Sequence, residues 1–164
     1  MARSVFYSFC YSDDINRTMV VRNRWVTQGN QTISGIIDKA EFEKLKRISD
    51  KAVHNWIDKQ LEGTSVTVVL LGTNTLTRPF VQYEICESIK RGNAVIGVHI
   101  NNIRDMITGS TSSKCNLHSV IGQYEDNTPA YFDNHNDGVY DYILDNGYEN
   151  LGKWVESAAK KKGK

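Results

Sequence analysis

The sequence predicts an α/β protein with a doubly wound, mainly parallel sheet and helices on both faces. Segments rich in β-branched and aromatic residues alternate with segments of helical periodicity, and the connections between them are short. The clearest strand is Val66–Leu71, a continuous apolar run that stops at Gly72. Pro79, a residue favoured in the first turn of a helix, then opens the next helical segment.

The first strand is expected at Ser4–Phe9 because aromatic and β-branched residues dominate it. The oxygens of Ser12–Asp14 can cap a following helix that ends before Gly29. Spacing along that helix directs three apolar side chains toward the core, namely Ile15, Met19 and Val26. A short second strand is expected at about Ser34–Asp38.

Later elements follow the same alternation. Ser49 can cap a second helix that closes at Gly63 and carries Val53, Trp56, Ile57 and Leu61 at helical spacing. After Val66–Leu71 we expect a helix at Pro79–Arg91, a strand at Ala94–Ile100, a last strand at Val139–Ile143 and a last helix at Tyr148–Ala159.

The chain of 164 residues is long enough for one hydrophobic core and short for two, so we expect a single domain over residues 1–164. Residues 104–138 are rich in Gly, Ser, Asn and Asp and are expected to form an irregular insertion. Residues 160–164 form a basic tail, interpreted as a solvated helix end.

The net charge of +1 predicts neither a nucleic-acid partner nor an anionic membrane surface. No apolar run is long enough to span a bilayer, and the first residues lack the apolar core of a signal peptide. The three cysteines are widely spaced, which favours reduced thiols. These observations predict a cytoplasmic protein.

Two kinds of ligand site find little support. The sequence contains neither a GxxxxGK[ST] phosphate loop nor a GxGxxG dinucleotide motif. Asp133–Gly138 begins like a calcium loop, but the twelfth position is Leu144 where a glutamate is required. Cys115 and His118 offer two zinc ligands where four are needed. We therefore expect no metal site and no bound cofactor.

Glu84 is the leading candidate for a catalytic group. At about 100° per residue, it lies on the flank of the apolar stripe of Val81, Ile85 and Ile89, in the second helical turn after a strand. In doubly wound sheets ligands bind at the carboxyl ends of the strands. A carboxylate near a helix N-terminus is also electrostatically favourable without any function. The residues alone leave both interpretations open.

Neighbouring strand ends supply candidate substrate-binding residues. Ser8, Phe9 and Tyr11 end or follow the first strand, and Asp38 ends the second. Hydroxyl groups and aromatic rings beside Glu84 would suit a sugar and a flat ring. Phe9 could equally be a core residue and Tyr11 a rim residue.

At these residues the chain resembles TIR-type domains, specifically the bacterial TIR-like ThsB family of Thoeris anti-phage systems. The resemblance covers about residues 3–105, with a weaker match over 139–155. It is carried by the motifs Val5-Phe-Tyr-Ser-Phe-Cys-Tyr-Ser-Asp13, Val20–Val26, Ser65–Thr75, Arg78–Ile89 and Gly92–Asn101.

The resemblance implies a flavodoxin-like sheet and an enzyme that breaks the nicotinamide–ribose bond of NAD⁺, its substrate, with Glu84 as the catalytic residue. It also implies a cyclic ADP-ribose isomer as product, a second messenger for the partner effector ThsA, and a phage-derived trigger. A loop from Asp38 to about Ile48 would gate the site. Tyr83 would join Phe9 and Tyr11 in an aromatic cluster that folds the dinucleotide.

The chemistry requires an ionised carboxylate, which a glutamate of ordinary pKa, about 4.3, supplies at neutral pH. Two other classes of function stay open: a non-catalytic TIR-like interaction or sensor module, and an N-glycosyl transferase acting on nucleosides. A monomer and a homo-oligomer are both compatible with the sequence, and so are several isomers of the cyclic product.

Overall fold

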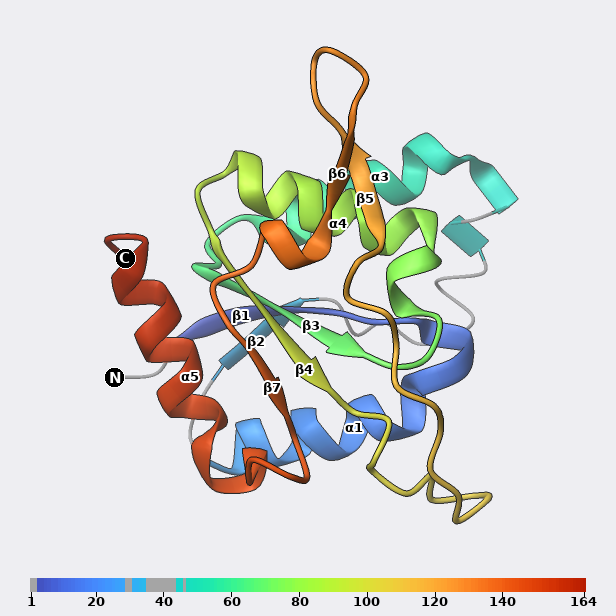
Figure 1. The fold of residues 1–164 in the computed structure, drawn as a ribbon, viewed down its shortest axis with the longest axis vertical. Helices are drawn as coiled ribbons and strands as arrows, with labels where there is room; N and C mark the ends of the chain where they lie inside the picture. The colour runs from blue at the N-terminus through green and yellow to red at the C-terminus, as the bar shows by residue number, and fades with distance from the viewer. Residues whose placement is uncertain (1–2, 29–30, 35–43, 46) are drawn as a thin grey trace.

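The computed structural model describes all residues except 1–2, 29–30, 35–43 and 46, and for residues 31–34 it describes the backbone alone. Five strands form one sheet, in the order β2-β1-β3-β4-β7, and every neighbouring pair is parallel. After β1 the chain adds β2 on one side of it and then β3, β4 and β7 on the other side. Doubly wound sheets bind ligands at this point of change, so a ligand-binding crevice is expected between β1 and β3. The predicted α/β, flavodoxin-like architecture is confirmed (Figure 1).

The sheet strands are β1 (Ser4–Ser8), β2 (Gln31–Ser34), β3 (Val66–Leu71), β4 (Ala94–His99) and β7 (Val139–Asp141). The helices are α1 (Tyr11–Thr27), α3 (Asp50–Leu61), α4 (Pro79–Lys90) and α5 (Gly147–Lys161). A separate hairpin consists of β5 (Val120–Gln123) and β6 (Pro129–Tyr131), and short 3₁₀ turns occupy Thr75–Thr77 and Phe132–Asn134.

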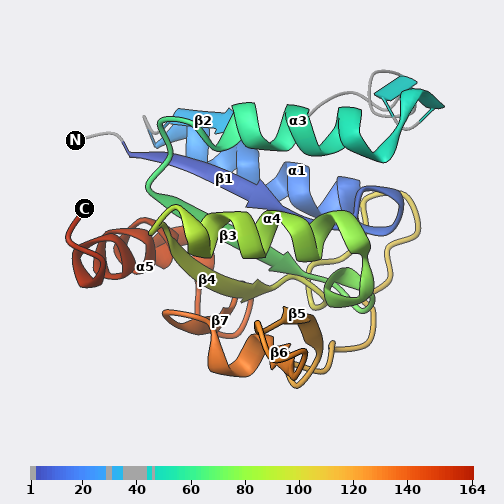
Figure 2. The same ribbon diagram turned by 90° about the horizontal axis from the view of Figure 1, so that it is seen from above.

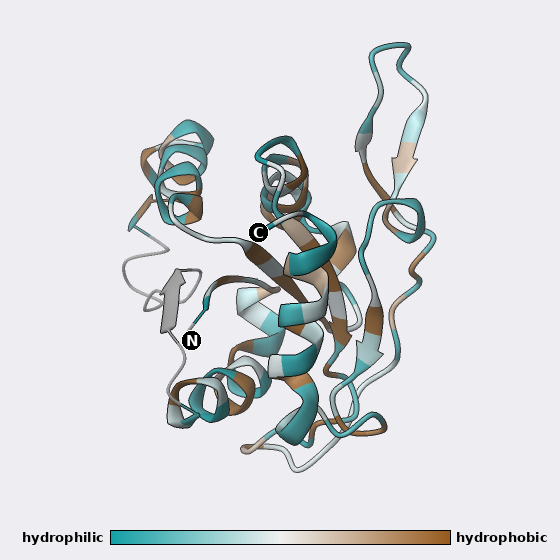
Figure 3. Cartoon of the chain, turned by 90° about the vertical axis from the view of Figure 1, so that its left-hand side faces the viewer, coloured by the Kyte–Doolittle hydropathy of each residue, from teal (hydrophilic) through white to brown (hydrophobic). Residues whose placement is uncertain are grey.

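Helices cover both faces of the sheet (Figure 2). On one face, α1 and α5 pack against alternate residues of β1, β3 and β4, including Tyr7, Val68 and Ile96. On the other face lie α4 with the β5–β6 hairpin, and α3. Because both faces are covered, β3 and β4 are buried along their whole length, which explains the unbroken apolar runs in their sequences. Figure 3 shows this apolar interior between more polar helix surfaces.

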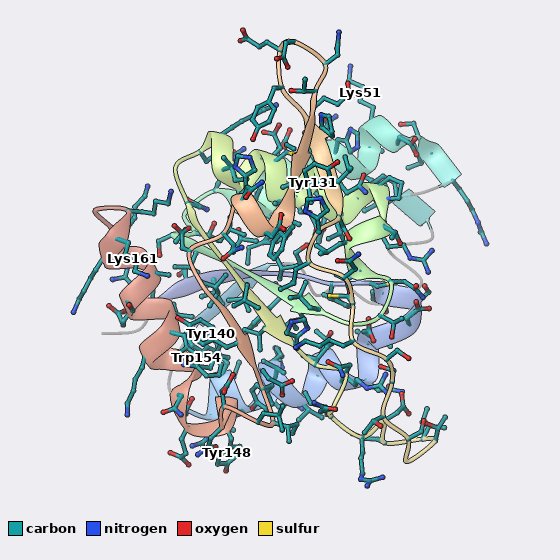
Figure 4. The ribbon with its side chains drawn as sticks, in the orientation of Figure 1. Lys51, Tyr131, Tyr140, Tyr148, Trp154 and Lys161 are labelled. Carbon is teal, nitrogen blue, oxygen red and sulfur yellow. The ribbon has the colours of Figure 1, made fainter. Side chains whose placement is uncertain are left out.

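Most element boundaries follow the sequence closely. Ser49 caps α3 by accepting a hydrogen bond from the Ala52 N–H at 3.0 Å, and the bounds of β3 are those predicted. At the C-terminal end, Tyr140 of β7 stacks on Trp154 of α5, with ring centroids 4.3 Å apart (Figure 4). This contact fixes the last helix on the last strand.

Four predictions need correction. α1 begins at Tyr11, so Ser12–Asp14 form its first turn instead of its cap. The buried side of α1 includes Asp14, Thr18, Val21 and Trp25, while Val26 is exposed. Ile15 packs against the core as expected, but apolar spacing missed the polar residues that this side also carries. The second strand begins at Gln31 instead of Ser34, and residues 35–38 of the predicted strand lie outside the described residues.

The fourth correction concerns residues 104–138, which contain the β5–β6 hairpin where the sequence predicted no regular structure. Ile121 and Phe132 fill an apolar cluster with Val81 and Ile85 of α4. The Gln82 amide also donates to the Val120 carbonyl at 3.2 Å. Tertiary contacts with α4 therefore hold strands that are too short and polar to be recognised by pattern.

Candidate active site

Ser8 and Glu84 meet at the carboxyl end of β1. The alternation of a strand places Ser8 on the same side as Phe6, which packs against α3, whereas Val5 and Tyr7 face α1. Glu84, in the second turn of α4, lies over this side. The Ser8 hydroxyl donates a hydrogen bond to Oε2 of Glu84. Two residues 76 positions apart are thereby joined beside the β1–β3 crevice.

The surroundings of Glu84 favour the protonated form of its carboxyl group. Burial raises the pKa of its carboxyl group to about 8, and the Ser8 hydrogen bond opposes this shift. The residue retains partial solvent exposure, but its carboxyl group is densely surrounded, and the pKa responds to the surroundings of the carboxyl group. The expectation of an ordinary, ionised glutamate is therefore not met, because sequence spacing does not reveal how many atoms surround a side chain.

Phe9, in the loop after β1, and Tyr11, the first residue of α1, lie next to this strand end. Phe9 is only 8 % exposed and packs in the core beneath α1. Tyr11 is partly buried against that core, and the two ring centroids are 5.9 Å apart. The structure thus favours a core role for Phe9 and a rim position for Tyr11.

Tyr83 belongs to a different cluster. Its ring stacks on His54 of α3 with centroids 3.8 Å apart, and its hydroxyl donates to Asp58 at 2.8 Å. It packs on the α3 face of the sheet, whereas Phe9 packs on the α1 face. The expected aromatic cluster of Phe9, Tyr11 and Tyr83 is therefore wrong, and the contacts of Tyr83 join two helices. Asp38, and most of the segment from Asp38 to Ile48, lie outside the described residues.

Acidic residues after β1 contribute more than the sequence indicated. The Asp13 carboxylate accepts hydrogen bonds from the side chains of Asn74 and Arg78, both at 3.2 Å. Asp14 is 3 % exposed and lies against Gly72, where a Cβ atom would come within 2.1 Å of its carboxylate. The first turn of α1 and the loop after β3 are thus tied together across the crevice. These two segments lie side by side because β1 pairs with β3, and the sequence patterns did not predict the order of the strands.

Comparison with known proteins decides the family. The family model for the TIR-like domain of the Thoeris protein ThsB matches residues 6–105. A protein of Bacillus cereus strain MSX-D12, provisionally named cyclic ADP-D-ribose synthase ThsB1, is 35 % identical over 191 aligned residues. That alignment covers 94 % of this chain and 100 % of the relative.

The chain belongs to the ThsB TIR-like family. The matched range contains β1, β3 and α4, and therefore both Ser8 and Glu84. In this ThsB-type domain the resemblance indicates Glu84 as the site residue, and the strand order independently places the ligand crevice at the carboxyl ends of β1 and β3, beside Glu84. The β5–β6 hairpin lies outside the range matched by the family model.

A groove of about 500 Å³ lies beside the first two turns of α4. It runs between α3, α4 and β5, and its lining residues are Asp50, His54, Pro79, Phe80, Gln82, Tyr83, Cys86 and Ile121. Neither Ser8 nor Glu84 lines this groove, although Phe80 precedes Glu84 by one helical turn on the same side of α4. An aromatic-lined space of this kind can receive a flat ring.

The candidate metal ligands are dispersed. The Cys115 sulfur lies 3.9 Å from Nδ1 of His99, whereas the His118 ring pairs with Asp133 at 2.9 Å and stacks on Tyr131, which is labelled in Figure 4. Over the described part of the chain, no group of three or more His, Cys, Asp or Glu side chains is arranged to hold a metal ion. None of its helices is both long and apolar enough to cross a membrane.

Proposed function

We propose that this protein is an NAD⁺-processing enzyme that breaks the nicotinamide–ribose bond and releases a cyclic ADP-ribose isomer. The observation that carries the proposal is the Ser8–Glu84 pair at the β1–β3 crevice, in a chain 35 % identical to a protein named as a cyclic ADP-D-ribose synthase. In this proposal Glu84 is the catalytic residue, NAD⁺ is the substrate, and no cofactor is required.

The substrate supplies the charge that Glu84 needs. The nicotinamide ring of NAD⁺ is cationic, and a cation bound nearby lowers the pKa of a buried carboxyl group. Binding would therefore convert Glu84 from the neutral acid to the carboxylate. Ser8 assists, because its hydrogen bond favours the charged form.

Bond cleavage then develops positive charge on the ribose. As the C1–N bond breaks, its electron pair leaves with nicotinamide, which becomes neutral, and the ribose acquires oxocarbenium character. The Glu84 carboxylate, preorganised by Ser8, stabilises that charge. Ring closure follows when an internal nucleophile of the same molecule bonds to C1 and loses its proton, and it requires that water be kept away.

In the family context the cyclic product would act as a second messenger for the effector ThsA after a phage-derived trigger. A second messenger diffuses from the enzyme to the effector, so the role requires one catalytic site on this protein and no direct contact with ThsA. It predicts accumulation of the cyclic nucleotide in infected cells that carry the gene.

Mass spectrometry of small molecules from infected cells tests the proposal. Cells with the wild-type protein should accumulate nicotinamide and a cyclic ADP-ribose isomer, and cells with Glu84→Gln should not. Glu87→Gln, the same change on the same helix at a residue paired with Lys90, is the matched control. Equal products from wild type and Glu84→Gln would exclude Glu84 as catalyst. Turnover of nucleosides instead of NAD⁺ would favour an N-glycosyl transferase, and a mutant phenotype without any turnover would favour an interaction module.

A further inference from the structure

Residues 110–115, here called the crossing segment, run across the carboxyl ends of β3 and β4. In Figures 1 and 2 the chain between β4 and β5 passes along the side of the sheet toward which the strand arrows point. The segment is fastened at three places: Arg17 of α1 donates to the Ser110 carbonyl at 3.0 Å, Thr73 to the Ser113 carbonyl at 2.5 Å, and the Ser112 N–H to the Asn101 carbonyl at 2.9 Å.

Four buried polar atoms at this edge lack a hydrogen-bond partner in the described structure. They are Oδ2 of Asp14, Nε2 of His99, Oδ1 of Asn101 and Oγ of Ser112. Asp14, His99 and Asn101 are only 3, 2 and 5 % exposed. Buried polar groups in native proteins are nearly always paired, so a group of unpaired ones calls for a ligand or ordered water.

Other atoms of the same four residues connect them to the crossing segment. The Asn101 amide donates to the Ser112 carbonyl at 3.3 Å, and Cys115 contacts His99 at 3.9 Å. Arg17 bridges the remaining gap, because it pairs with Asp14 at 3.6 Å and also holds Ser110. Asn101 and His99 thus contact the crossing segment directly, Ser112 is part of it, and Asp14 is linked to it through Arg17.

This network is separate from the Ser8–Glu84 pair but lies along the same edge. β3 stands between β1 and β4, and adjacent strands are about 4.8 Å apart. The ends of β1 and β4 are thus about 10 Å apart across the sheet, a distance that the diphosphate bridge of a dinucleotide can cover. Gly72 lies between them, and it allows the Asp14 carboxylate to approach β3 because it has no Cβ.

The chemistry of the network suits hydroxyl groups. The Asp14 carboxylate and the Asn101 carbonyl oxygen are acceptors, and the Ser112 hydroxyl and His99 ring can donate or accept. Arg17, the cation of the network, is already committed to Asp14 and to two carbonyls, those of Ile103 and Ser110. Acceptors beside a carboxylate repel a phosphate and attract the hydroxyls of a sugar, as an acidic side chain does in dinucleotide-binding folds.

We propose that Asp14, His99, Asn101 and Ser112 form a ribose subsite that binds the hydroxyl groups of the second, adenosine-side ribose of the dinucleotide. This inference rests on the proposed function only for the identity of the dinucleotide. Bound there, the adenosine half is held over the edge of the sheet while the nicotinamide ribose lies at Glu84. Fixing both halves favours attack by an internal nucleophile over attack by water.

Affinity for ADP-ribose, measured by calorimetry, tests the subsite without requiring turnover. Ser112→Ala removes a hydroxyl that has no protein partner, so the melting temperature should stay unchanged while the dissociation constant rises roughly 2- to 10-fold, the effect of one hydrogen bond. Ser113→Ala, an exposed neighbour whose carbonyl is retained, is the matched control. Equal affinities of the two variants, or no binding of ADP-ribose to the wild type, would overturn the subsite.

A second measurement separates this inference from the proposed function. Asp14→Asn should raise the proportion of linear over cyclic product at least several-fold, because a loosened adenosine half lets water compete. An unchanged product ratio in a folded Asp14→Asn protein would count against the subsite. If ADP-ribose affinity depends on Ser112 but no variant releases nicotinamide from NAD⁺, the subsite stands and the proposed function fails.

Discussion

Replacing Glu84 by Gln should make the protein more stable while it removes activity. The carboxyl group has a pKa of about 8 in the folded chain against an ordinary value of 4.5. Between these two values the unfolded chain is ionised and the folded chain is protonated, so the folded state holds more protons and loses stability as pH rises. Glutamine has nearly the same shape and never ionises, so it avoids this loss.

The magnitude follows from the shift. Each pH unit between 4.5 and 8 costs the wild type about 1.4 kcal/mol. The penalty is therefore about 3 kcal/mol at pH 7 and about 5 kcal/mol above pH 8, and partial solvent exposure of Glu84 makes these upper values. For a chain of this size, about 3 kcal/mol corresponds to roughly 6–12 °C in melting temperature.

Urea denaturation of wild type, Glu84→Gln and Glu87→Gln at pH 4.5, 6, 7 and 8.5 measures the effect. The Glu84→Gln advantage should be near zero at the lowest pH, grow through neutrality and level off above pH 8. Glu87→Gln should differ from wild type by no more than about 0.5 kcal/mol, since it loses one exposed ion pair. A Glu84→Gln protein no more stable than wild type at pH 8.5 would refute the reasoning that burial governs this carboxyl group.

Two further predictions concern the same crevice. Ser8→Ala removes the hydrogen bond that lowers the Glu84 pKa, so the rise of kcat/KM with pH should shift to more alkaline values; a profile superimposable on wild type would show that Ser8 does not tune Glu84. Gly72→Ala places a Cβ within 2.1 Å of the Asp14 carboxylate, so urea denaturation should show a loss of about 1–3 kcal/mol from overpacking, and wild-type stability would mean that Asp14 can move aside freely.

The sequence predicted the sheet well because its signals are local. The apolar run Val66–Leu71, the Ser49 cap and the Pro79 helix start each act within a few residues, and each is found where expected. The buried side of α1 was predicted only in part, because it includes Asp14 and Thr18, whose burial depends on distant partners. The same limit explains the hairpin after residue 104, which is held by contacts with α4.

The candidate site was predictable in position and less so in chemistry. A helical wheel placed Glu84 on the flank of the buried side, and strand order brings Ser8 to it. The protonation of Glu84 depends on how densely other atoms surround its carboxyl group, and residue spacing in the sequence does not reveal that density. Tyr83 was grouped with the wrong aromatic residues because a helix position does not reveal which neighbouring helix it will face.

The hidden acid at position 84 has a consequence for the choice between the two redox forms of the dinucleotide. Near pH 7 a carboxyl group with a pKa of about 8 keeps most of its protons, and a nearby positive charge favours their release; the oxidised nicotinamide ring carries that charge whereas the reduced ring does not. Uptake of the oxidised form near pH 7 should thus release up to one proton into the buffer, which calorimetry in buffers of different ionisation heat would detect. The oxidised substrate would thus help to form the catalytic Glu84 carboxylate, whereas the reduced dinucleotide would leave Glu84 protonated and inactive.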